Sequence, residues 1–379
     1  MIQSKLPNVC TTIFTVMSKM ANDHSAINLS QGFPDFPIDQ KLIELTNKAM
    51  LSGANQYAPM PGLPILRENL AAKVEKLYHL KVNADDEVTI TSGATEALFC
   101  AITAVVESGD EVIVFEPAYD SYHPVIDLCG GKIVPLELSA PNYQIPWDEV
   151  RDKINDKTKL IIINTPQNPT GTILKANDLE ELEAIVDQHG LFAISDEVYE
   201  HLIYDGERHE SALRYPALYN RTFVIYSFGK VFHTTGWKMG YCIAPKALTT
   251  EFRKVHQFVV FSSTTPMQLA IAKYLEDENN YLSLSAFFEQ KRNYFNSLIK
   301  DSRFEIIPCQ GTYFQLLSYK NITDLGDMEF ASKMTKENGI ASIPMSAFYG
   351  SKKDDHILRF CFAKQDKTLL KAAEKLCKI

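Results

Sequence analysis

Apolar runs of strand length alternate with helical stretches along the middle of the chain. The run Leu160-Ile161-Ile162-Ile163 is typical of a strand that is buried on both of its faces. Helices are predicted between such runs, for example over Ala94–Glu107 and Asn177–Gln188. The alternation predicts an α/β fold around a mostly parallel sheet that is flanked by helices. The predicted strands are Glu87–Thr91, Glu111–Glu116, Lys132–Glu137, Lys159–Asn164, Leu191–Ser195, Thr222–Ser227 and Met239–Ala244.

The C-terminal part of the chain has a different pattern, in which long helices precede short strands. This order predicts a second, smaller α+β domain, with a boundary within residues 277–303. The predicted helices are Leu248–Phe261, Thr265–Asp277, Tyr281–Lys300, Asp327–Asn338 and Lys367–Lys378, and the predicted strands are Phe304–Ile307, Thr312–Leu317 and His356–Phe362.

Composition excludes several classes of function. A net charge of −9 over 379 residues argues against a nucleic-acid partner or an anionic membrane partner. No apolar run is long enough to span a membrane. The seven cysteines are scattered without C-x-x-C spacing, which fits free thiols in a reducing compartment better than disulfides or a metal site. We therefore expect a cytoplasmic protein without a bound metal.

A short string around Lys230 carries the most specific chemical signal. Lys230 stands on a Gly-containing turn, with the hydroxyl of Ser227 three residues before it and the ammonium of Lys238 eight residues after it. Burial and a neighbouring cation both lower the pKa of a lysine, as a Schiff-base lysine requires. Ser227 and Lys238 are suited to hold a phosphate. The string through Gly240 predicts covalent binding of pyridoxal 5′-phosphate (PLP), although Ser-x-Gly-Lys alone fits a solvated surface loop as well.

Two further clusters follow apolar strands, where ligands of open α/β sheets gather. In the first, Asn168 can donate a hydrogen bond to the phenolic oxygen of PLP, and the alternative is a simple turn rich in Asn, Pro and Gly. In the second, Asp196 can keep the pyridine nitrogen protonated and Tyr199 can reach the phenolic oxygen. The alternative for this cluster is the N-cap of a following helix.

These motifs occur together in a known order and spacing. Lys230 with its downstream T-G-W-K-M-G, the N-P-T-G at 168–171 and the D-E-V-Y at 196–199 resemble fold-type I PLP-dependent transferases, specifically class I/II aminotransferases. The resemblance extends from Asn28 to Phe362. It implies a large PLP-binding domain over residues 46–280, a small α+β domain over residues 281–379, and an N-terminal segment, residues 1–45, that contributes to the small domain.

Two more segments narrow the resemblance. The strings at 55–60 and 116–122 are similar to the branch that contains bacterial methionine aminotransferases, kynurenine aminotransferases and glutamine transaminase K. The resemblance implies an enzyme that moves the amino group of methionine or an aromatic amino acid to a 2-oxo acid, with glutamine and kynurenine as further donors. Its partners would be these small molecules and a second copy of the chain, in a homodimer with shared active sites.

The resemblance also implies roles for single residues. Lys230 would form the Schiff base and act as general acid and base, Asp196 would pair with the pyridinium nitrogen, and Asn168 and Tyr199 would bond the phenolic oxygen. Tyr119 would stack on the cofactor ring.

The phosphate would lie on Gly93-Ala94-Thr95, at a helix N-terminus that favours anions, between Ser227 and Lys238. Most of the wider family has an arginine where this chain has Lys238. Tyr57 would reach the phosphate from the neighbouring subunit.

Substrate recognition follows from the same resemblance. Arg359 would bind the α-carboxylate in a bidentate manner, as a planar guanidinium can, and Gly32 and Asn168 would contact the same group. The alternative for Arg359 is a surface ion pair. Apolar side chains that would line the substrate pocket, each of them also a plausible core residue, are Ile13, Phe14, Tyr57, Tyr122 and Phe348.

The sequence can be compared with two alternative functions, of which the first remains open and the second is disfavoured. A PLP-dependent cysteine-conjugate carbon–sulfur β-lyase on the same fold would use the same lysine and aspartate. A PLP-binding transcription regulator would need a basic DNA-binding module, for which the matched motif, beginning at Asn28, leaves no room.

Overall fold

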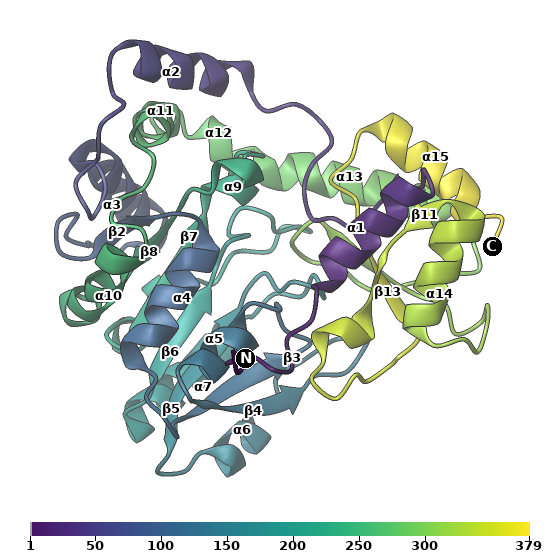
Figure 1. The fold of residues 1–379 in the computed structure, drawn as a ribbon, viewed down its shortest axis with the longest axis horizontal. Helices are drawn as coiled ribbons and strands as arrows, with labels where there is room; N and C mark the ends of the chain where they lie inside the picture. Colours follow the sequence, from purple (N-terminus) through teal and green to yellow (C-terminus); the bar gives the residue numbers. More distant parts are fainter. Residues whose placement is uncertain (1) are drawn as a thin grey trace.

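The computed structural model describes residues 2–379 and contains two large β-sheets, seen in the left and right halves of Figure 1. The larger sheet has seven strands in the order β2-β8-β7-β6-β5-β3-β4. Strand β8 runs in the opposite direction to the other six, which are parallel to one another. The mostly parallel α/β sheet is therefore confirmed. Its strands are β2 (Val88–Thr91), β3 (Glu111–Glu116), β4 (Lys132–Glu137), β5 (Thr158–Asn164), β6 (Phe192–Asp196), β7 (Thr222–Ser227) and β8 (Gly240–Ile243).

Both faces of this sheet are buried, as the apolar run in β5 predicts. Leu160 and Ile162 belong to one hydrophobic cluster, whereas Ile161 and Ile163 belong to the other. Alternate residues of a strand point to opposite faces, so a continuous apolar run serves two cores at once. The helices around the sheet are α3 (Pro64–Tyr78), α4 (Ala94–Val105), α5 (Tyr122–Leu128), α6 (Trp147–Lys153), α7 (Ala176–His189), α8 (Pro216–Tyr219), α9 (Phe228–Val231), α10 (Lys246–Val259) and α11 (Thr265–Leu275).

The smaller sheet is antiparallel and has four strands in the order β12-β13-β10-β9. The single helix predicted over Tyr281–Lys300 is wrong, because the structure has two helices that meet at Ser283. The Ser283 hydroxyl donates to the carbonyl oxygen of Asn279 at 2.6 Å, as its backbone N–H also does at 3.3 Å. The elements of this part are α12 (Asn279–Leu282), α13 (Leu284–Ile299), β9 (Glu305–Ile306), β10 (Phe314–Ser318), α14 (Asp327–Lys333), β12 (Ile343–Pro344), β13 (Ile357–Cys361) and α15 (Asp366–Leu376).

Helix α1 (Ile13–Asp23) and strand β1 (Ile27–Asn28) lie against the C-terminal part of the chain, whereas α2 (Gln40–Leu51) lies over α11 in the other half of the molecule (Figure 1). The short strand β1 pairs in parallel with β11 (Ile340–Ala341). Helices α1 and α2, like α3, are absent from the predicted elements. Among residues 2–379, no helix has the length and apolar character needed to cross a bilayer.

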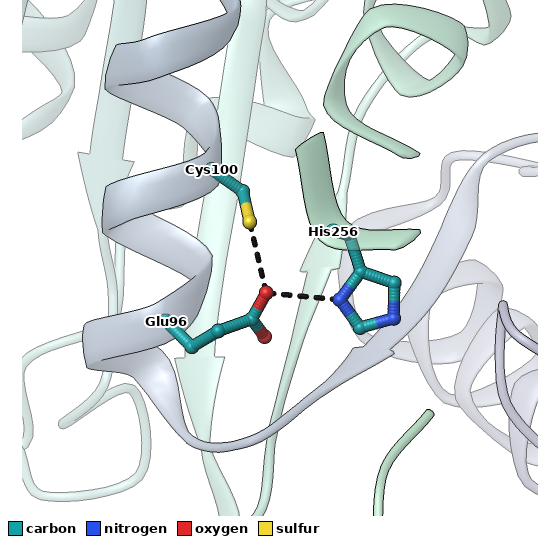
Figure 2. A group of neighbouring side chains, drawn as sticks. All are labelled: Glu96, Cys100 and His256. Atoms are coloured by element: carbon teal, nitrogen blue, oxygen red, sulfur yellow. Dashed lines mark hydrogen bonds and ion pairs between the residues drawn. The ribbon is translucent and has the colours of Figure 1, made fainter. Parts of the chain in front are cut away.

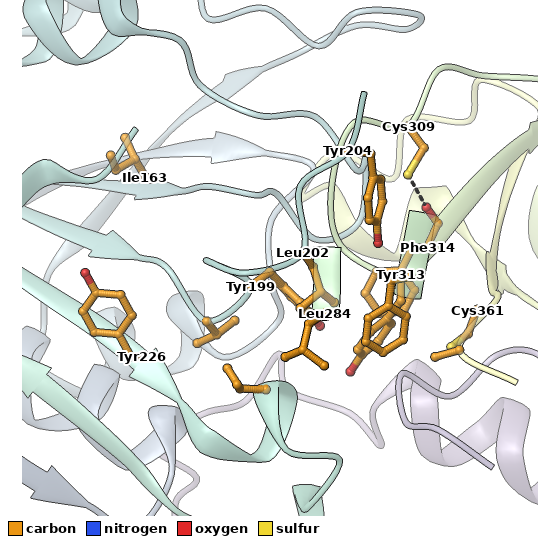
Figure 3. Close-up of a cluster of buried hydrophobic side chains, with 14 of the residues drawn as sticks. Ile163, Tyr199, Leu202, Tyr204, Tyr226, Leu284, Cys309, Tyr313, Phe314 and Cys361 are labelled. Carbon is orange, nitrogen blue, oxygen red and sulfur yellow. Dashed lines mark hydrogen bonds between the residues drawn. The ribbon is translucent and has the colours of Figure 1, made fainter. Parts of the chain in front are cut away.

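A shared core joins the two large sheets beside the ends of the parallel strands. Figure 3 shows Tyr199 and Leu202, which follow β6, beside Tyr313 and Phe314 at the start of β10. The ring centroids of Tyr199 and Tyr313 lie 5.2 Å apart in an edge-to-face arrangement. This packing fixes the small sheet relative to the strand ends where the site residues lie.

Candidate active site

A cavity opens at the C-terminal ends of the parallel strands, where open α/β sheets bind ligands. Asn164 ends β5, Asp196 ends β6 and Ser227 ends β7. The cavity brings together every predicted cofactor residue except Tyr57. They are Gly93, Ala94, Thr95, Tyr119, Asn168, Asp196, Tyr199, Ser227, Lys230 and Lys238.

Lys230 lies on the short helix α9, which begins directly after β7. Its Nζ atom donates to the Gly32 carbonyl oxygen at 3.4 Å and lies 5.6 Å from the centre of the Tyr199 ring. Burial lowers the pKa of Lys230 to about 8, and the positive charge of Arg359 adds to this more than that of Lys238 does. A fraction of the amine is therefore unprotonated near neutral pH.

Asp196 is buried at the end of β6, with only 3% of its surface exposed. The Tyr122 hydroxyl donates to its Oδ2 atom at 2.7 Å, and the Val198 N–H donates to Oδ1 at 3.3 Å. Burial raises the pKa of Asp196 to about 6, and these hydrogen bonds hold it lower than burial alone would. A pyridinium nitrogen beside it would favour the carboxylate further. No helix begins at Asp196, so the N-cap alternative does not hold in residues 2–379.

The N-terminus of α4 has the form of an anion cradle. Gly93 has φ +81°, and α4 has no side-chain cap, so its first N–H groups are left free. The Lys238 Nζ atom lies 3.4 Å from the position that a Cβ on Gly93 would take. A Cβ on Gly240 would lie only 2.8 Å from the Ala94 nitrogen, so glycine is required there for close approach of the two backbones. Free N–H groups beside an ammonium fit a phosphate.

Asn168 connects the cavity to Arg359. Its backbone N–H donates to Asn164 Oδ1 at 2.8 Å, and its Oδ1 accepts from Arg359 Nη1 at 2.6 Å. Asn164 Nδ2 in turn donates to the Asp196 carbonyl oxygen at 2.7 Å. The segment also forms a turn, in which the Gly171 N–H donates to Gln167. The turn interpretation and the site interpretation of this motif are therefore compatible.

Arg359 is a buried cation with an unused donor. It is 1% exposed and lies on β13, and its Nη2 donates to the Ser30 carbonyl oxygen at 2.9 Å. Its Nε atom is buried and has no hydrogen-bond partner within residues 2–379. Burial lowers the pKa of Arg359 to about 10, so the group remains charged at neutral pH. A buried guanidinium with a free donor fits carboxylate binding, and the surface ion-pair alternative is excluded.

The predicted substrate residues divide into two groups. The rings of Phe14 and Phe348 each lie 5.2 Å from the Arg359 guanidinium carbon, and Gly32 faces Lys230 through its carbonyl oxygen. Tyr57 is elsewhere, 84% exposed and packed edge-on against Phe261. The prediction that Tyr122 lines an apolar pocket is wrong, because this side chain is 2% exposed and hydrogen-bonds Asp196.

Several residues of the site were missed from the sequence. Asn164 has a visible signal, since it ends an apolar strand. Tyr313 has none, because its hydroxyl reaches the Gly32 carbonyl oxygen, at 2.6 Å, only through the tertiary fold. The same holds for the Ser30 carbonyl oxygen that accepts from Arg359.

The chain matches the family described as aminotransferase class I and II over residues 24–376. The chain belongs to this family. Its members use PLP, and the fold-type I expectation is confirmed by solved structures of aminotransferases that match the whole chain. The protein is therefore an aminotransferase.

Individual relatives agree with this assignment. The chain is 48% identical to a methionine aminotransferase of Escherichia coli over 375 residues, which are 99% of this chain and 97% of the relative. It is 35% identical to kynurenine–oxoglutarate transaminase 1 of Homo sapiens, over 95% of this chain and 94% of that one. A crystal structure of an Escherichia coli protein with methionine aminotransferase function superposes with a TM-score of 0.98 at 47% identity, over 100% of both chains. These relatives favour transamination over the carbon–sulfur lyase alternative.

Proposed function

We propose that this aminotransferase binds PLP through Lys230 and takes its amino group from methionine or aromatic amino acids, with glutamine and kynurenine as further donors. The observation that carries the proposal is one cavity that holds Lys230, Asp196 and Asn168, with the buried Arg359 bonded to Asn168. Burial also lowers the pKa of Lys230 to about 8. Lys230, Asp196 and Arg359 are the nucleophile, the ring-nitrogen partner and the carboxylate anchor that the reaction requires.

The cavity residues provide matching contacts for the cofactor. PLP supplies an electron sink for the negative charge that develops when the substrate Cα loses a proton. Asp196 would hold a proton on the ring nitrogen, and Asn168 and Tyr199 would bond the phenolic oxygen. Tyr119 would pack on the ring face. Gly93, Ala94 and Thr95, through their free N–H groups, would hold the phosphate together with Ser227 and Lys238.

Arg359 and Lys230 then act on the amino acid itself. Arg359 binds the α-carboxylate, with Gly32 and Asn168 beside it, and so fixes which bond of Cα faces Lys230. The Lys230 amine, unprotonated in part near neutral pH, would take the proton from the substrate Cα and deliver it to the PLP carbon to which Lys230 had been joined, so that the amino group stays with the cofactor. Holding the carboxylate in this way favours loss of the proton over loss of carbon dioxide.

Donor preference follows from the surroundings of Arg359. The rings of Phe14, Phe314 and Phe348 lie within 5.2 Å of its guanidinium carbon. An aromatic surface of this kind suits the thioether of methionine and aromatic side chains. The relatives named for methionine and kynurenine support the same preference.

We also propose the assembly and the division of the chain. Tyr57 is exposed and apart from its own cavity, which supports its role as a phosphate ligand in the partner subunit of a homodimer. Residues 46–280 form the large domain, and residues 281–379 together with the 1–45 segment form the small one. The seven free cysteines support a reducing, cytoplasmic location.

The role of Tyr57 can be tested by substitution. Tyr57→Phe is expected to weaken PLP binding about tenfold without changing the dimer mass, as measured by cofactor titration and sedimentation.

The first experiment uses the PLP-loaded protein without any oxo acid. Each amino acid of a panel is mixed with it, and loss of the visible absorbance of bound PLP is followed. Methionine and phenylalanine should react fast and aspartate slowly, whereas fast reaction with aspartate would refute the donor preference. Lys230→Ala should abolish turnover, and the exposed control Lys254→Ala should retain it. Release of pyruvate and ammonia from a cysteine conjugate would indicate the lyase instead.

A further inference from the structure

Behind the proposed phosphate cradle lies a buried cluster of three polar side chains, Glu96, Cys100 and His256 (Figure 2). Glu96 and Cys100 lie one turn apart on α4, and His256 comes from α10. Glu96 Oε1 accepts from Cys100 Sγ at 2.8 Å and lies 2.9 Å from His256 Nδ1. The side chain of Glu96 is 8% exposed and that of His256 is 0% exposed.

The contacts of His256 fix the number of protons in this cluster. Nε2 lies 3.0 Å from the Met60 carbonyl oxygen, which can only accept, so Nε2 carries a proton. The contact between Nδ1 and the Glu96 oxygen contains a second proton, whichever of the two atoms holds it. Burial raises the pKa of the Cys100 thiol, which therefore stays protonated and donates. Glu96 and His256 together thus carry no net charge.

Glu96 lies at the helix end where the phosphate would bind, so the net charge of the Glu96–His256 pair affects binding of the phosphate. Glu96 is the third residue of α4, and its Oε2 accepts from the Ser92 N–H at 3.0 Å. It therefore bonds an N–H that precedes the helix and leaves the N–H groups of Gly93, Ala94 and Thr95 to an anion. An uncompensated carboxylate in this first turn would repel a phosphate bound at the same helix end.

His256 also holds the segment that carries Tyr57. Met60, whose carbonyl oxygen it bonds, lies three residues after Tyr57. The Phe261 N–H donates to the His256 carbonyl oxygen at 3.2 Å, and the Phe261 ring packs against Tyr57 at 5.4 Å. One histidine thus connects a protomer's own phosphate cradle to the tyrosine that it would offer to its partner.

The alternative interpretation of this cluster is a metal-binding site. Three potential ligand atoms lie within 4.8 Å of one another. However, the carboxylate oxygen, the thiol and the ring nitrogen already satisfy one another by hydrogen bonds, and Nε2 is used by Met60. The cluster is complete without an ion.

We propose that His256 is a positioning residue for the cofactor phosphate: it neutralises Glu96 at the N-terminus of α4 and ties the Tyr57 segment to that helix. The proposal rests on the proposed function, because it takes the phosphate to bind at this helix end. It assigns His256 no contact with PLP or substrate.

The test is a cofactor titration of PLP-free protein, read by absorbance and by dimer mass. His256→Leu leaves the Glu96 charge without a partner and should weaken PLP binding about tenfold or more. Glu96→Gln added to His256→Leu removes that charge and should restore most of the lost affinity. Leu248→Ala, a buried change at the other end of the same helix, controls for lost packing and should leave PLP affinity unchanged.

The outcomes separate the two proposals. Failure of the wild-type protein to bind PLP would refute the proposed function. If the wild-type protein binds PLP but the single and double variants are equally weak, or both bind as wild type does, the role of His256 is refuted. His256→Gln serves in place of His256→Leu if the leucine variant does not fold, because glutamine can still donate to Met60 while leaving Glu96 charged.

Discussion

Replacing Arg359 with leucine should change both substrate binding and the proton affinity of Lys230. The guanidinium has a free Nε donor, and Nη1 and Nη2 each use one N–H, for Asn168 and the Ser30 carbonyl oxygen, and keep a second one for a substrate. Two charge-assisted hydrogen bonds to a substrate carboxylate contribute about 1.5–3 kcal/mol each, and each 1.36 kcal/mol is a factor of ten. We therefore expect kcat/KM to fall about 10²- to 10⁴-fold for every amino acid.

The second effect follows from the charge of Arg359. The pKa of Lys230 is about 8 instead of 10.5, mainly through burial and next through the charge of Arg359. Arg359→Leu removes that charge but not the burial, so the pKa of Lys230 should rise above 8 and remain below 10.5. A higher pKa leaves less unprotonated amine at neutral pH, and the rate should recover as the pH is raised.

Arg359→Lys is the matched control for this prediction. It keeps the charge and loses the planar fork, so kcat/KM should fall while the pKa of Lys230 stays near 8. The assay is competitive acetylation of the PLP-free protein across a pH series, with the Lys230 peptide quantified by mass spectrometry. Equal pKa values in the wild type and the leucine variant, or a loss of kcat/KM confined to one amino acid, would refute the reasoning.

Two further substitutions test other parts of the site. Tyr122→Phe removes the hydroxyl that donates to Asp196 at 2.7 Å, so the pKa of Asp196 should rise above 6. We expect kcat near pH 7 to fall about tenfold, and an unchanged kcat–pH profile would contradict the role of Tyr122. Gly240→Ala puts a Cβ 2.8 Å from the Ala94 nitrogen and should lower the free energy of unfolding by about 1–3 kcal/mol and weaken PLP binding. Calorimetry and cofactor titration measure these effects. Wild-type values in both would contradict the claim that glycine is required at position 240.

The central sheet was predictable because its signals are local. Each of its seven strands differs from the predicted range by at most one residue at either end. Continuous apolar runs such as 160–163 occur where both faces of a parallel sheet are covered. Asp196 and Ser227 lie at the ends of such runs. Because the carboxyl ends of parallel strands meet at one edge of the sheet, the sequence predicts that these residues lie close together.

Elements with weaker local signals were missed. Helices α1, α2 and α3 were not predicted, although Asp39 caps α2 and Pro64 begins α3, two recognised start signals. The break at Ser283 has no signal in the sequence, because the helical pattern continues on both sides of it. Hydrophobic periodicity reports the apolar face of a helix and does not report where the helix is interrupted.

The sequence by itself determined the local setting of Lys230 and predicted its chemistry, since the glycine turn, the preceding hydroxyl and the following cation are all close along the chain. Only the tertiary structure decided which charge acts most on that lysine. The fold brings Arg359 from β13 beside Lys230, binds it to Asn168 and buries it. Tyr122 likewise reaches Asp196 only because α5 packs near β6. Charge and burial act through space, and a pKa therefore depends on neighbours that sequence distance does not reveal.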